Sequence, residues 1–118
     1  MKSHFFRLNY PSHFAIDTLI ASENLNGRMP ELGALLRPGH VVLAVSYEPS
    51  SAVGQVRAMG RVMAAGARLK IDWRAIDFKL HPSPQGQQQW KKEHFCFDKT
   101  VAQRYKLDAH VNDLFSDV

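Results

Sequence analysis

Residues 53–76 contain the pattern that most limits how this chain can fold. From Val53 to Ala65, small apolar residues alternate with larger side chains, and a second alternating stretch, 69–76, follows Ala65-Gly66-Ala67. A period of two places one set of side chains on each face of an extended strand. A short glycine-containing connection between two such stretches is typical of a hairpin. The sequence therefore predicts two antiparallel strands, with Gly60 marking either a bulge or a close backbone approach.

Three further segments have the composition of strands. Residues 40–47 are almost continuously apolar and β-branched, as a strand covered on both faces should be. Residues 4–10 are rich in aromatic and apolar side chains and end at Pro11, and residues 94–98 alternate again. Together with the hairpin, these segments predict that a sheet is the main element of the fold.

Helices are predicted in three places. Ser12 is positioned to cap the first, whose apolar residues keep helical spacing until Asn26-Gly27 ends it. One helical turn is expected within residues 27–39, and Asp108 is positioned to cap a closing helix with an apolar stripe. Residues 81–89, with two prolines and four glutamines, are predicted to be an exposed loop. Strands and helices together predict an α+β fold.

The composition limits the chain to one domain. A length of 118 residues supports a single domain, 1–118, and leaves no room for a second core. With 45% hydrophobic and 22% charged residues, the chain is expected to fold. One cysteine, Cys96, cannot form an intrachain disulfide, so a reducing compartment such as the cytoplasm is expected. No stretch approaches the roughly 18 apolar residues of a membrane span, and neither secretion nor membrane insertion is expected.

No catalytic motif is recognisable. The sequence has no glycine-rich phosphate loop, no nucleophile elbow and no zinc-protease histidine pair. The six histidines lack the short spacings of a metal site, and Cys96 lies between two phenylalanines, as a small buried hydrophobe would. The sequence therefore predicts a non-catalytic protein without metal or other cofactor.

Three arginines are candidates for contacting phosphates. The net charge of +4 favours an anionic partner. Arg57 and Arg61 lie four residues apart on one predicted strand, which places them on the same face. Arg74 lies on the exposed face of the next strand, together with Lys70. A solvated face beside Asp72 is the alternative interpretation of these charges.

Four large aromatic residues are candidates for binding a flat ligand. Tyr10 and Tyr47 end their predicted strands, Trp73 lies on the hairpin, and Trp90 follows the glutamine-rich loop. Aromatic faces stack on bases and attract partial positive charge. Trp73 continues an apolar strand face and is more readily explained as core, whereas Trp90 has polar neighbours and is the better candidate for contact.

Several short motifs follow one another in a recognisable order. They are Phe5-Phe6-Arg7-Leu8-Asn9-Tyr10, Asn26-Gly27-Arg28-Met29-Pro30-Glu31-Leu32, Leu36-Arg37-Pro38-Gly39-His40-Val41-Val42-Leu43 and Val56-Arg57-Ala58-Met59-Gly60-Arg61-Val62, with Trp90, Phe95-Cys96-Phe97 and Tyr105-Lys106-Leu107 in the tail. This order resembles the EVE domain of the PUA-like superfamily, and Leu69-Lys70-Ile71-Asp72-Trp73 is similar to the related YTH domains. The chain has Phe6 and His40 where the EVE family usually has tryptophan and aspartate.

The resemblance implies a small, partly open, PUA-like mixed β-barrel of about five to six strands with flanking helices. It also implies a pocket for a modified base, such as a methylated one, in DNA or RNA. Asn9 and Tyr10 would lie at the mouth of this pocket, with Tyr47 as a wall and Trp90 as a lid. With Trp73 added from the aromatic pattern, these five residues are the predicted base-contacting set.

Two functions fit these observations. The first is a non-catalytic module that binds DNA or RNA carrying a modified base, alone or beside a partner protein such as a nuclease. The second is an interaction or regulatory module that docks on another protein through a strand edge or the glutamine-rich loop. The two functions predict different positions for the side chains of Arg57, Arg61 and Trp90. If these side chains converge on one concave surface, nucleic-acid binding is favoured, and if they are dispersed, protein binding is favoured.

Overall fold

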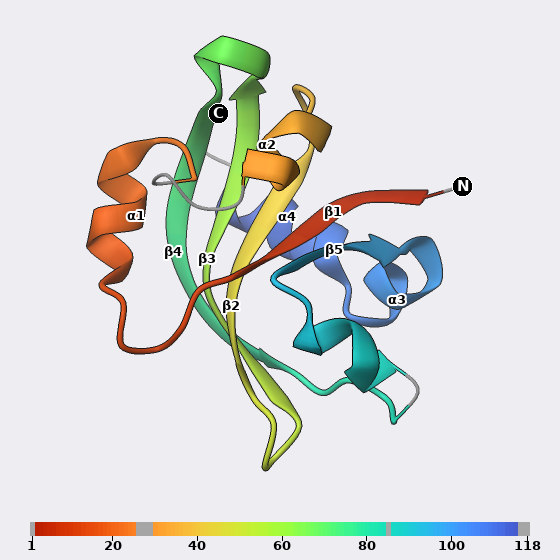
Figure 1. Ribbon diagram of the computed structural model, residues 1–118. Helices are drawn as coiled ribbons and strands as arrows, with labels where there is room; N and C mark the ends of the chain where they lie inside the picture. Colours follow the sequence, from red (N-terminus) through yellow and green to blue (C-terminus); the bar gives the residue numbers. More distant parts are fainter. Residues whose placement is uncertain (1, 26–29, 85, 116–118) are drawn as a thin grey trace.

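Five strands form one mixed sheet in the computed structural model, which describes residues 2–25, 30–84 and 86–115 (Figure 1). The strands lie in the order β4-β3-β2-β1-β5. β1 runs parallel to β2, and the other neighbours are antiparallel. The bounds are β1 Lys2–Asn9, β2 Val41–Glu48, β3 Val53–Ala64, β4 Lys70–Leu80 and β5 His94–Asp98.

The sheet is open, and it is not closed into a barrel. β4 and β5 lie at opposite ends of the strand order. β5 pairs with β1, and the chain then continues into a helix instead of a strand that reaches β4. The barrel implied by the family resemblance is thereby corrected to an open five-stranded sheet within the predicted α+β class. The antiparallel β3–β4 hairpin is confirmed.

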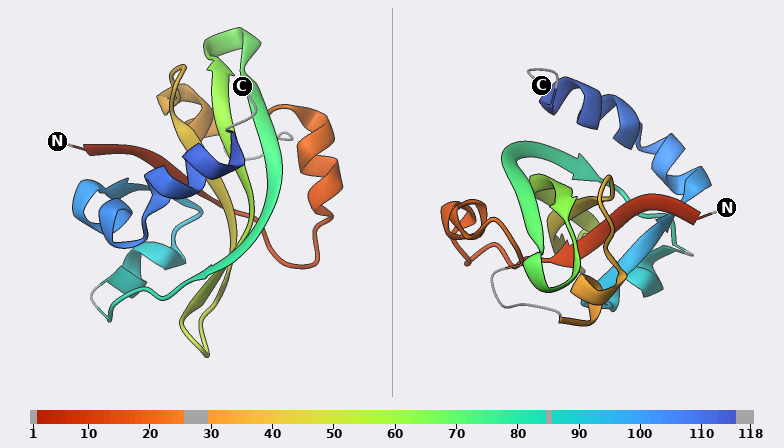
Figure 2. Two further views of the ribbon diagram at one scale, coloured as in Figure 1. Left: turned by 180° about the vertical axis from the view of Figure 1, so that it is seen from behind. Right: turned by 90° about the horizontal axis from the view of Figure 1, so that it is seen from above.

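Helices cover both faces of the sheet (Figure 2). Two helices pack on the face that we call the α1 face, and the remaining ones, with a 3-10 turn, pack on the opposite α4 face. Another 3-10 turn, η1, joins β3 to β4. The bounds are α1 Ile16–Ser22 and α2 Pro30–Leu35 on the first face, η2 Gly86–Lys91, α3 Lys99–Arg104 and α4 Leu107–Leu114 on the second, and η1 Gly66–Arg68.

Each face of the sheet carries its own hydrophobic core, and β2 contributes to both. Val41, Leu43 and Val45 belong to the core of the α4 face. Val42 and Ala44 belong to the core of the α1 face. All five side chains are buried, which confirms the prediction of a strand covered on both sides.

The first helix begins later than predicted. Ala15 occupies the N-cap of α1, because the backbone N–H of Phe14 first donates to the carbonyl of Pro11 in a turn. Ser12 is therefore not the cap. α1 ends at Ser22, after which Glu23 adopts the left-handed conformation with φ of 56°. The stop predicted at Asn26-Gly27 lies outside the described residues.

The C-terminal half also differs from the prediction in two places. The segment 81–89 is not an open loop throughout, because the 3-10 turn η2 begins at Gly86 within it. The predicted closing helix is α4, with Lys106 instead of Asp108 at its N-cap, and α3, which was not predicted, precedes it. Asp108 lies in the first helical turn, where a carboxylate is still favourable to the helix dipole.

A bulge and a close backbone approach were the two alternatives predicted for Gly60, and β3 contains both, at different residues. The close approach is at Gly60, where a Cβ would lie 2.4 Å from Ile71 and 2.7 Å from Trp73. The bulge is at Arg57, because Ala44 pairs with Ala58 and Val45 pairs with Val56. The extra residue reverses the alternation of side chains along the strand.

Candidate functional site

The bulge places Arg57 on a different face from Arg61, so the predicted shared face is wrong. Arg57 turns to the α1 face, where its guanidinium lies 5.5 Å from the centre of the Tyr10 ring. Its Nη1 donates to the carbonyls of Pro11 at 3.0 Å and Phe14 at 2.7 Å. Arg57 therefore holds the turn before α1 in place, and these donors are already used within the protein.

Arg61 and Arg74 lie on the α4 face. Both guanidinium groups lie over the ring of Phe115, at 4.9 Å and 4.6 Å from its centre. Arg74 also donates to the carbonyl of Leu114 and forms an ion pair with Asp72 at 3.2 Å. The three predicted phosphate contacts are thus dispersed over two faces, and each packs against an aromatic ring of its own protein.

Two of the predicted base-contacting residues are core residues of the α1 face. The Tyr10 hydroxyl donates to the carbonyl of Ala15 at 2.7 Å. The indole N–H of Trp73 donates to the carbonyl of Asn24 at 2.6 Å. Both side chains are buried. For Trp73 the core interpretation that the sequence favoured is therefore the one observed.

The other three predicted base-contacting residues gather around Arg7, on the opposite side of β1. Trp90 is only 4% exposed, because it packs in the core of the α4 face and does not form a mobile lid. Its ring centre lies 5.5 Å from that of Tyr47 and 5.1 Å from the Arg7 guanidinium. Asn9 accepts a hydrogen bond from Arg7 and donates one to Glu93.

Arg7 is the unusual residue of this cluster, since its side chain is 1% exposed. Its Nη1 donates to the carbonyls of Trp90 and Lys92, and its Nη2 donates to the carbonyl of Val45 and to Asn9 Oδ1. The Nε has no hydrogen-bond partner among the described residues. Burial lowers the pKa of Arg7 to about 10, against the opposing effect of the Glu93 carboxylate, so the group is charged at neutral pH.

The hydrogen bonds of Arg7 join three separate segments. β1 carries the residue, β2 supplies one carbonyl, and η2 and its connection to β5 supply one each. Asn9 extends this network to Glu93, the residue before β5. The cluster that contains Asn9, Tyr47 and Trp90 therefore fixes β5 to the sheet, and it is filled by its own side chains.

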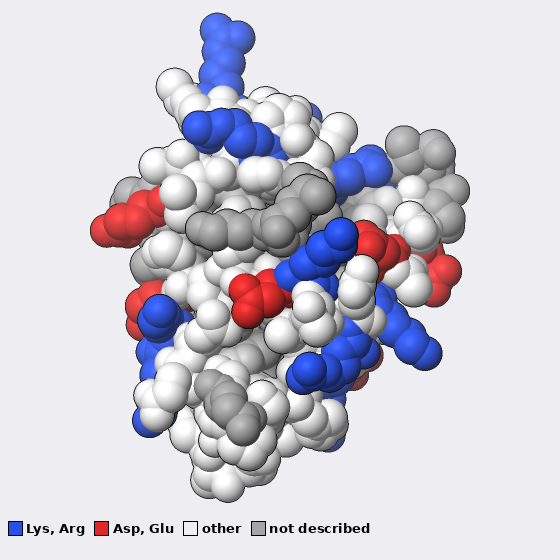
Figure 3. Space-filling model, turned by 90° about the vertical axis from the view of Figure 1, so that its right-hand side faces the viewer, with Lys and Arg blue, Asp and Glu red and all other residues white. Residues whose placement is uncertain are grey.

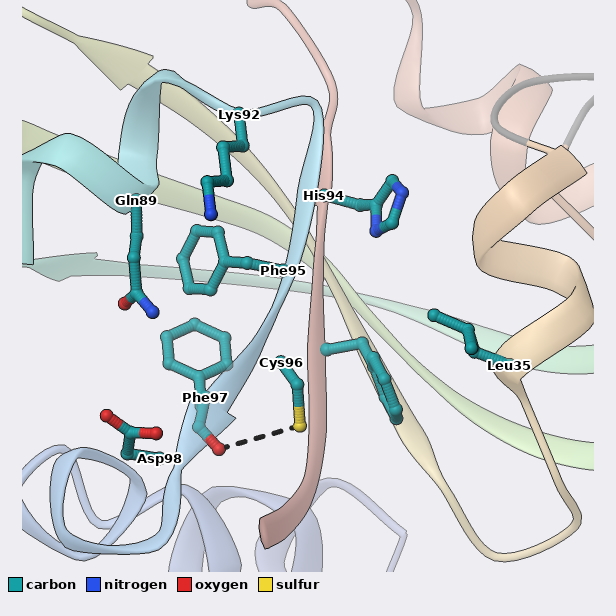
Figure 4. A pocket seen from close by; sticks show the side chains of 9 residues that line it. Leu35, Gln89, Lys92, His94, Phe95, Cys96, Phe97 and Asp98 are labelled. Atoms are coloured by element: carbon teal, nitrogen blue, oxygen red, sulfur yellow. Dashed lines mark hydrogen bonds between the residues drawn. The ribbon is translucent and has the colours of Figure 1, made fainter.

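A hollow of about 410 Å³ lies beside β5, at the end of the sheet (Figure 4). Phe95 and Phe97 point to one side of the strand, and His94 points to the other, toward Leu35 of α2. Leu35 is 52% exposed, which is rare for a large apolar side chain in this molecule. The lining is Phe6, Leu35, Gln89, Lys92, His94, Phe95, Cys96, Phe97 and Asp98.

Neither Tyr10 nor Tyr47 lines this hollow, or the narrow one beneath η2, or the one beside α1. The hollow at β5 was not predicted from the sequence. The signal for it was the short alternating segment 94–98, which forms the last strand in the order β4-β3-β2-β1-β5. The exposed cations next to it, in the Lys-Lys pair that follows Trp90, were also visible in the sequence.

Basic side chains predominate on the face of the molecule that carries β5 and α3 (Figure 3). Exposed cations lie on η2, just after it and on α3, at Lys91, Lys92, Lys99 and Arg104, and the exposed carboxylates of Glu93 and Asp98 lie between them in the sequence. Lys92 also lines the hollow itself. The surface beside β5 is therefore open and carries positive charge.

The two edges of the sheet differ. At β4, the backbone N–H of Ile71 donates to the carbonyl of Glu23 at 2.6 Å, so the C-terminal end of α1 covers part of that edge. Lys70 and Glu23 form an exposed ion pair across the same contact, at 3.5 Å. A hollow lies beside each edge, of about 410 Å³ at β5 and of about 370 Å³ at β4, where Glu23 and Lys70 line it. The β5 edge is therefore the candidate binding surface.

The comparisons with known proteins give no relative, since no protein-family model, no curated protein and no solved structure matches this chain. Within residues 2–25, 30–84 and 86–115, no group of three or more histidine, cysteine, aspartate or glutamate residues could hold a metal ion. In the same part of the chain, no helix has the length and apolar character needed to cross a membrane.

Proposed function

We propose that this domain is a non-catalytic interaction module that accepts an extended protein segment along the edge of β5. The observation that carries the proposal is the hollow beside an edge strand that pairs on its other side with β1 alone. An edge strand offers backbone donors and acceptors to a further strand, and flanking pockets select its side chains.

The two sides of β5 differ in the side chains that they offer to such a segment. Phe95 and Phe97 lie on one side and are buried in the core of the α4 face, whereas the exposed Leu35 lies on the other side, and Lys92 also lines the hollow. Side chains of an added strand point alternately to the two sides. The proposed partner segment is therefore extended, apolar at alternate positions, and carries a negative charge near Lys92.

The test uses a library of random eight-residue peptides, selected on the full chain, followed by affinity measurements with two variants at one position. His94→Pro removes a backbone N–H from the edge, and proline is tolerated on edge strands. His94→Ala keeps the N–H and removes only the imidazole. Selected peptides are expected to lose at least about tenfold in affinity for His94→Pro and to keep most of it for His94→Ala. Equal binding to wild type and His94→Pro would contradict the proposal.

A second function, binding of nucleic acid that carries a modified base, is favoured by one observation. Lys91, Lys92, Lys99 and Arg104 are exposed beside the hollow, where phosphates could reach them. The resemblance to EVE domains points to the same class of ligand. In this proposal the lysines contact the phosphate backbone of the nucleic acid, and the hollow holds the unstacked base.

Titration of fluorescent oligonucleotides, with and without a methylated base, tests this second function. The double variant Lys91→Gln/Lys92→Gln is expected to weaken binding. The slope of the logarithm of the binding constant against the logarithm of the salt concentration should become less steep by about 1.4 to 1.8, at 0.7 to 0.9 for each of two lost phosphate contacts. Arg68→Gln/Lys70→Gln removes the same charge at the far end of the hairpin and serves as the control. Absent binding at low salt, or equal losses in both variants, would exclude a specific site at η2.

A further inference from the structure

We propose that Arg61 and Arg74 form a binding site for a phosphate group on the α4 face of the sheet, beside the ring of Phe115. This site is separate from the β5 edge, because its residues lie on β3 and β4, and β4 and β5 are at opposite ends of the strand order. The ligand is a phosphate group, carried by a small phosphomonoester or by the backbone of a nucleic acid.

Arg61 differs from the other arginines that pack against aromatic rings. Arg7, Arg57 and Arg74 all donate to backbone carbonyls of the protein. Arg61 is half-buried against Phe115, but no hydrogen bond or ion pair joins its guanidinium to another residue in the described part of the chain. An aromatic ring attracts the charge of a guanidinium without supplying ordinary acceptors for its five N–H groups. The donors of Arg61 are therefore available to an acceptor from outside the protein.

Arg74 places a second positive charge beside Arg61. The two guanidinium carbons lie 4.9 Å and 4.6 Å from the centre of the Phe115 ring, so they are less than about 10 Å apart, a distance comparable with the screening length of physiological salt. Arg74 forms an ion pair with Asp72, and its side chain remains 25% exposed. Two cations at this separation repel each other, and an anion that bridges them is attracted by both.

The two arginine side chains are positioned before any ligand binds. β3 and β4, which carry them, pair as an antiparallel hairpin. Phe115 directly follows α4, which crosses the sheet (Figure 2), and its ring contacts both guanidinium groups. Side chains that are already ordered lose less conformational entropy when a ligand binds. The packing against Phe115 therefore favours binding as well as stability.

A phosphate matches these donors better than a carboxylate does. Its oxygens can accept from two guanidinium groups at once, one of them in the bidentate geometry that arginine forms with phosphate. A carboxylate has two oxygens, and a single guanidinium can occupy both. Because Arg61 and Arg74 are both partly exposed, a phosphate attached to a larger molecule can reach them. Inorganic phosphate alone is expected to bind with a dissociation constant in the millimolar range.

Nuclear magnetic resonance of the arginine Nε–Hε groups tests this site in the full chain. Inorganic phosphate, titrated at constant ionic strength, is expected to shift the Arg61 signal with saturation. The Arg57 signal should stay unchanged, because the Arg57 guanidinium already donates to Pro11 and Phe14. Arg61→Gln is expected to raise the dissociation constant by about tenfold, and Arg68→Gln, which removes the same charge from η1, is the matched control. Arg61→Lys keeps the charge but loses the planar fork, so a smaller loss is expected, and it serves as the test if Arg61→Gln does not fold.

The same titration with adenosine monophosphate and with a short oligothymidylate separates the two sources of phosphate. Tighter binding of the monophosphate indicates a small phosphomonoester, and tighter binding of the oligothymidylate indicates the backbone of a single strand. Either result supports the site if the Arg61 variants weaken it. The inference would be overturned if phosphate produced no saturable shift at Arg61, or if chloride produced the same shift. Equal phosphate affinity in the wild type and the Arg61 variants, or an equal loss in Arg68→Gln, would overturn it as well.

Discussion

Arg7 shows how one residue in an apolar strand can carry a structural role that composition does not reveal. It stands between Phe6 and Leu8, and its guanidinium reaches four acceptors from three segments. Burial of a charge is costly unless its donors are satisfied, and here carbonyl oxygens accept from Nη1 and Nη2 in place of a carboxylate, while Nε has no partner among the described residues. Arg7 therefore specifies where the connection from η2 to β5 must lie.

Arg7→Lys is expected to lower the free energy of unfolding by roughly 2–4 kcal/mol, because a single ammonium cannot reach the acceptors of a planar, five-donor group. Urea denaturation measures this loss. Arg68→Gln, at an exposed position of η1, is the control and should change stability by less than about 0.5 kcal/mol. An Arg7→Lys variant as stable as the wild type would show that the network does not hold β5.

Gly60 and Gly33 give opposite expectations for the same substitution. Gly60→Ala is expected to destabilise the protein by roughly 1–3 kcal/mol, since its Cβ would lie 2.4 Å from Ile71. Gly33→Ala meets Leu25 and Leu69 at 3.6 and 3.7 Å, ordinary contact distances, and gains up to about 1 kcal/mol of helix propensity in α2. Thermal denaturation of both variants checks the contrast, and equal shifts in melting temperature would contradict it.

At the scale of elements, the irregularity of β3 explains why the arginines of the predicted phosphate patch do not share a face of the sheet. Arg57 and Arg61 are four residues apart, and a regular strand would align them. The bulge at Arg57 adds one residue between the pairs Ala44–Ala58 and Val45–Val56, which moves Arg57 to the α1 face. Nothing in the local pattern specifies that bulge, because its position depends on how β2 and β4 pair on either side.

Arg57→Gln is expected to loosen the turn at residues 11–14 without unfolding the sheet, because it removes the donor to Pro11 and Phe14. Amide hydrogen exchange should therefore increase in residues 12–22 and stay unchanged in β2. Arg61→Gln, on the other face, is the matched control. Faster exchange throughout the sheet would show that Arg57 supports the whole fold.

The sequence predicted the elements of this fold better than their arrangement. Alternation and apolar runs located the hairpin and the buried strand at 40–47, because those patterns follow from burial on known faces. The same patterns could not predict that Trp90, among glutamines and lysines, would be buried. Its burial depends on Arg7 and on Phe95 and Phe97, which lie elsewhere in the sequence and meet it only after the chain has folded.

At the scale of the whole molecule, the sheet has two faces covered by helices and two edges that differ. The end of α1 covers part of the β4 edge, and the β5 edge borders a hollow with basic side chains around it. The residues that the sequence predicted as a ligand site pack against other residues of the protein itself. We therefore propose that partners bind at the β5 edge, through backbone groups as much as through side chains.

Amide hydrogen exchange at two adjacent residues of β5 tests this placement most directly. Phe95 pairs with Arg7 of β1, so its N–H is expected to be protected at all concentrations. The N–H of His94 points to the outer edge and is expected to exchange rapidly in dilute protein. It should become protected when a selected peptide is bound. Rapid exchange at His94 in a saturated complex would contradict the proposal that partners pair with β5.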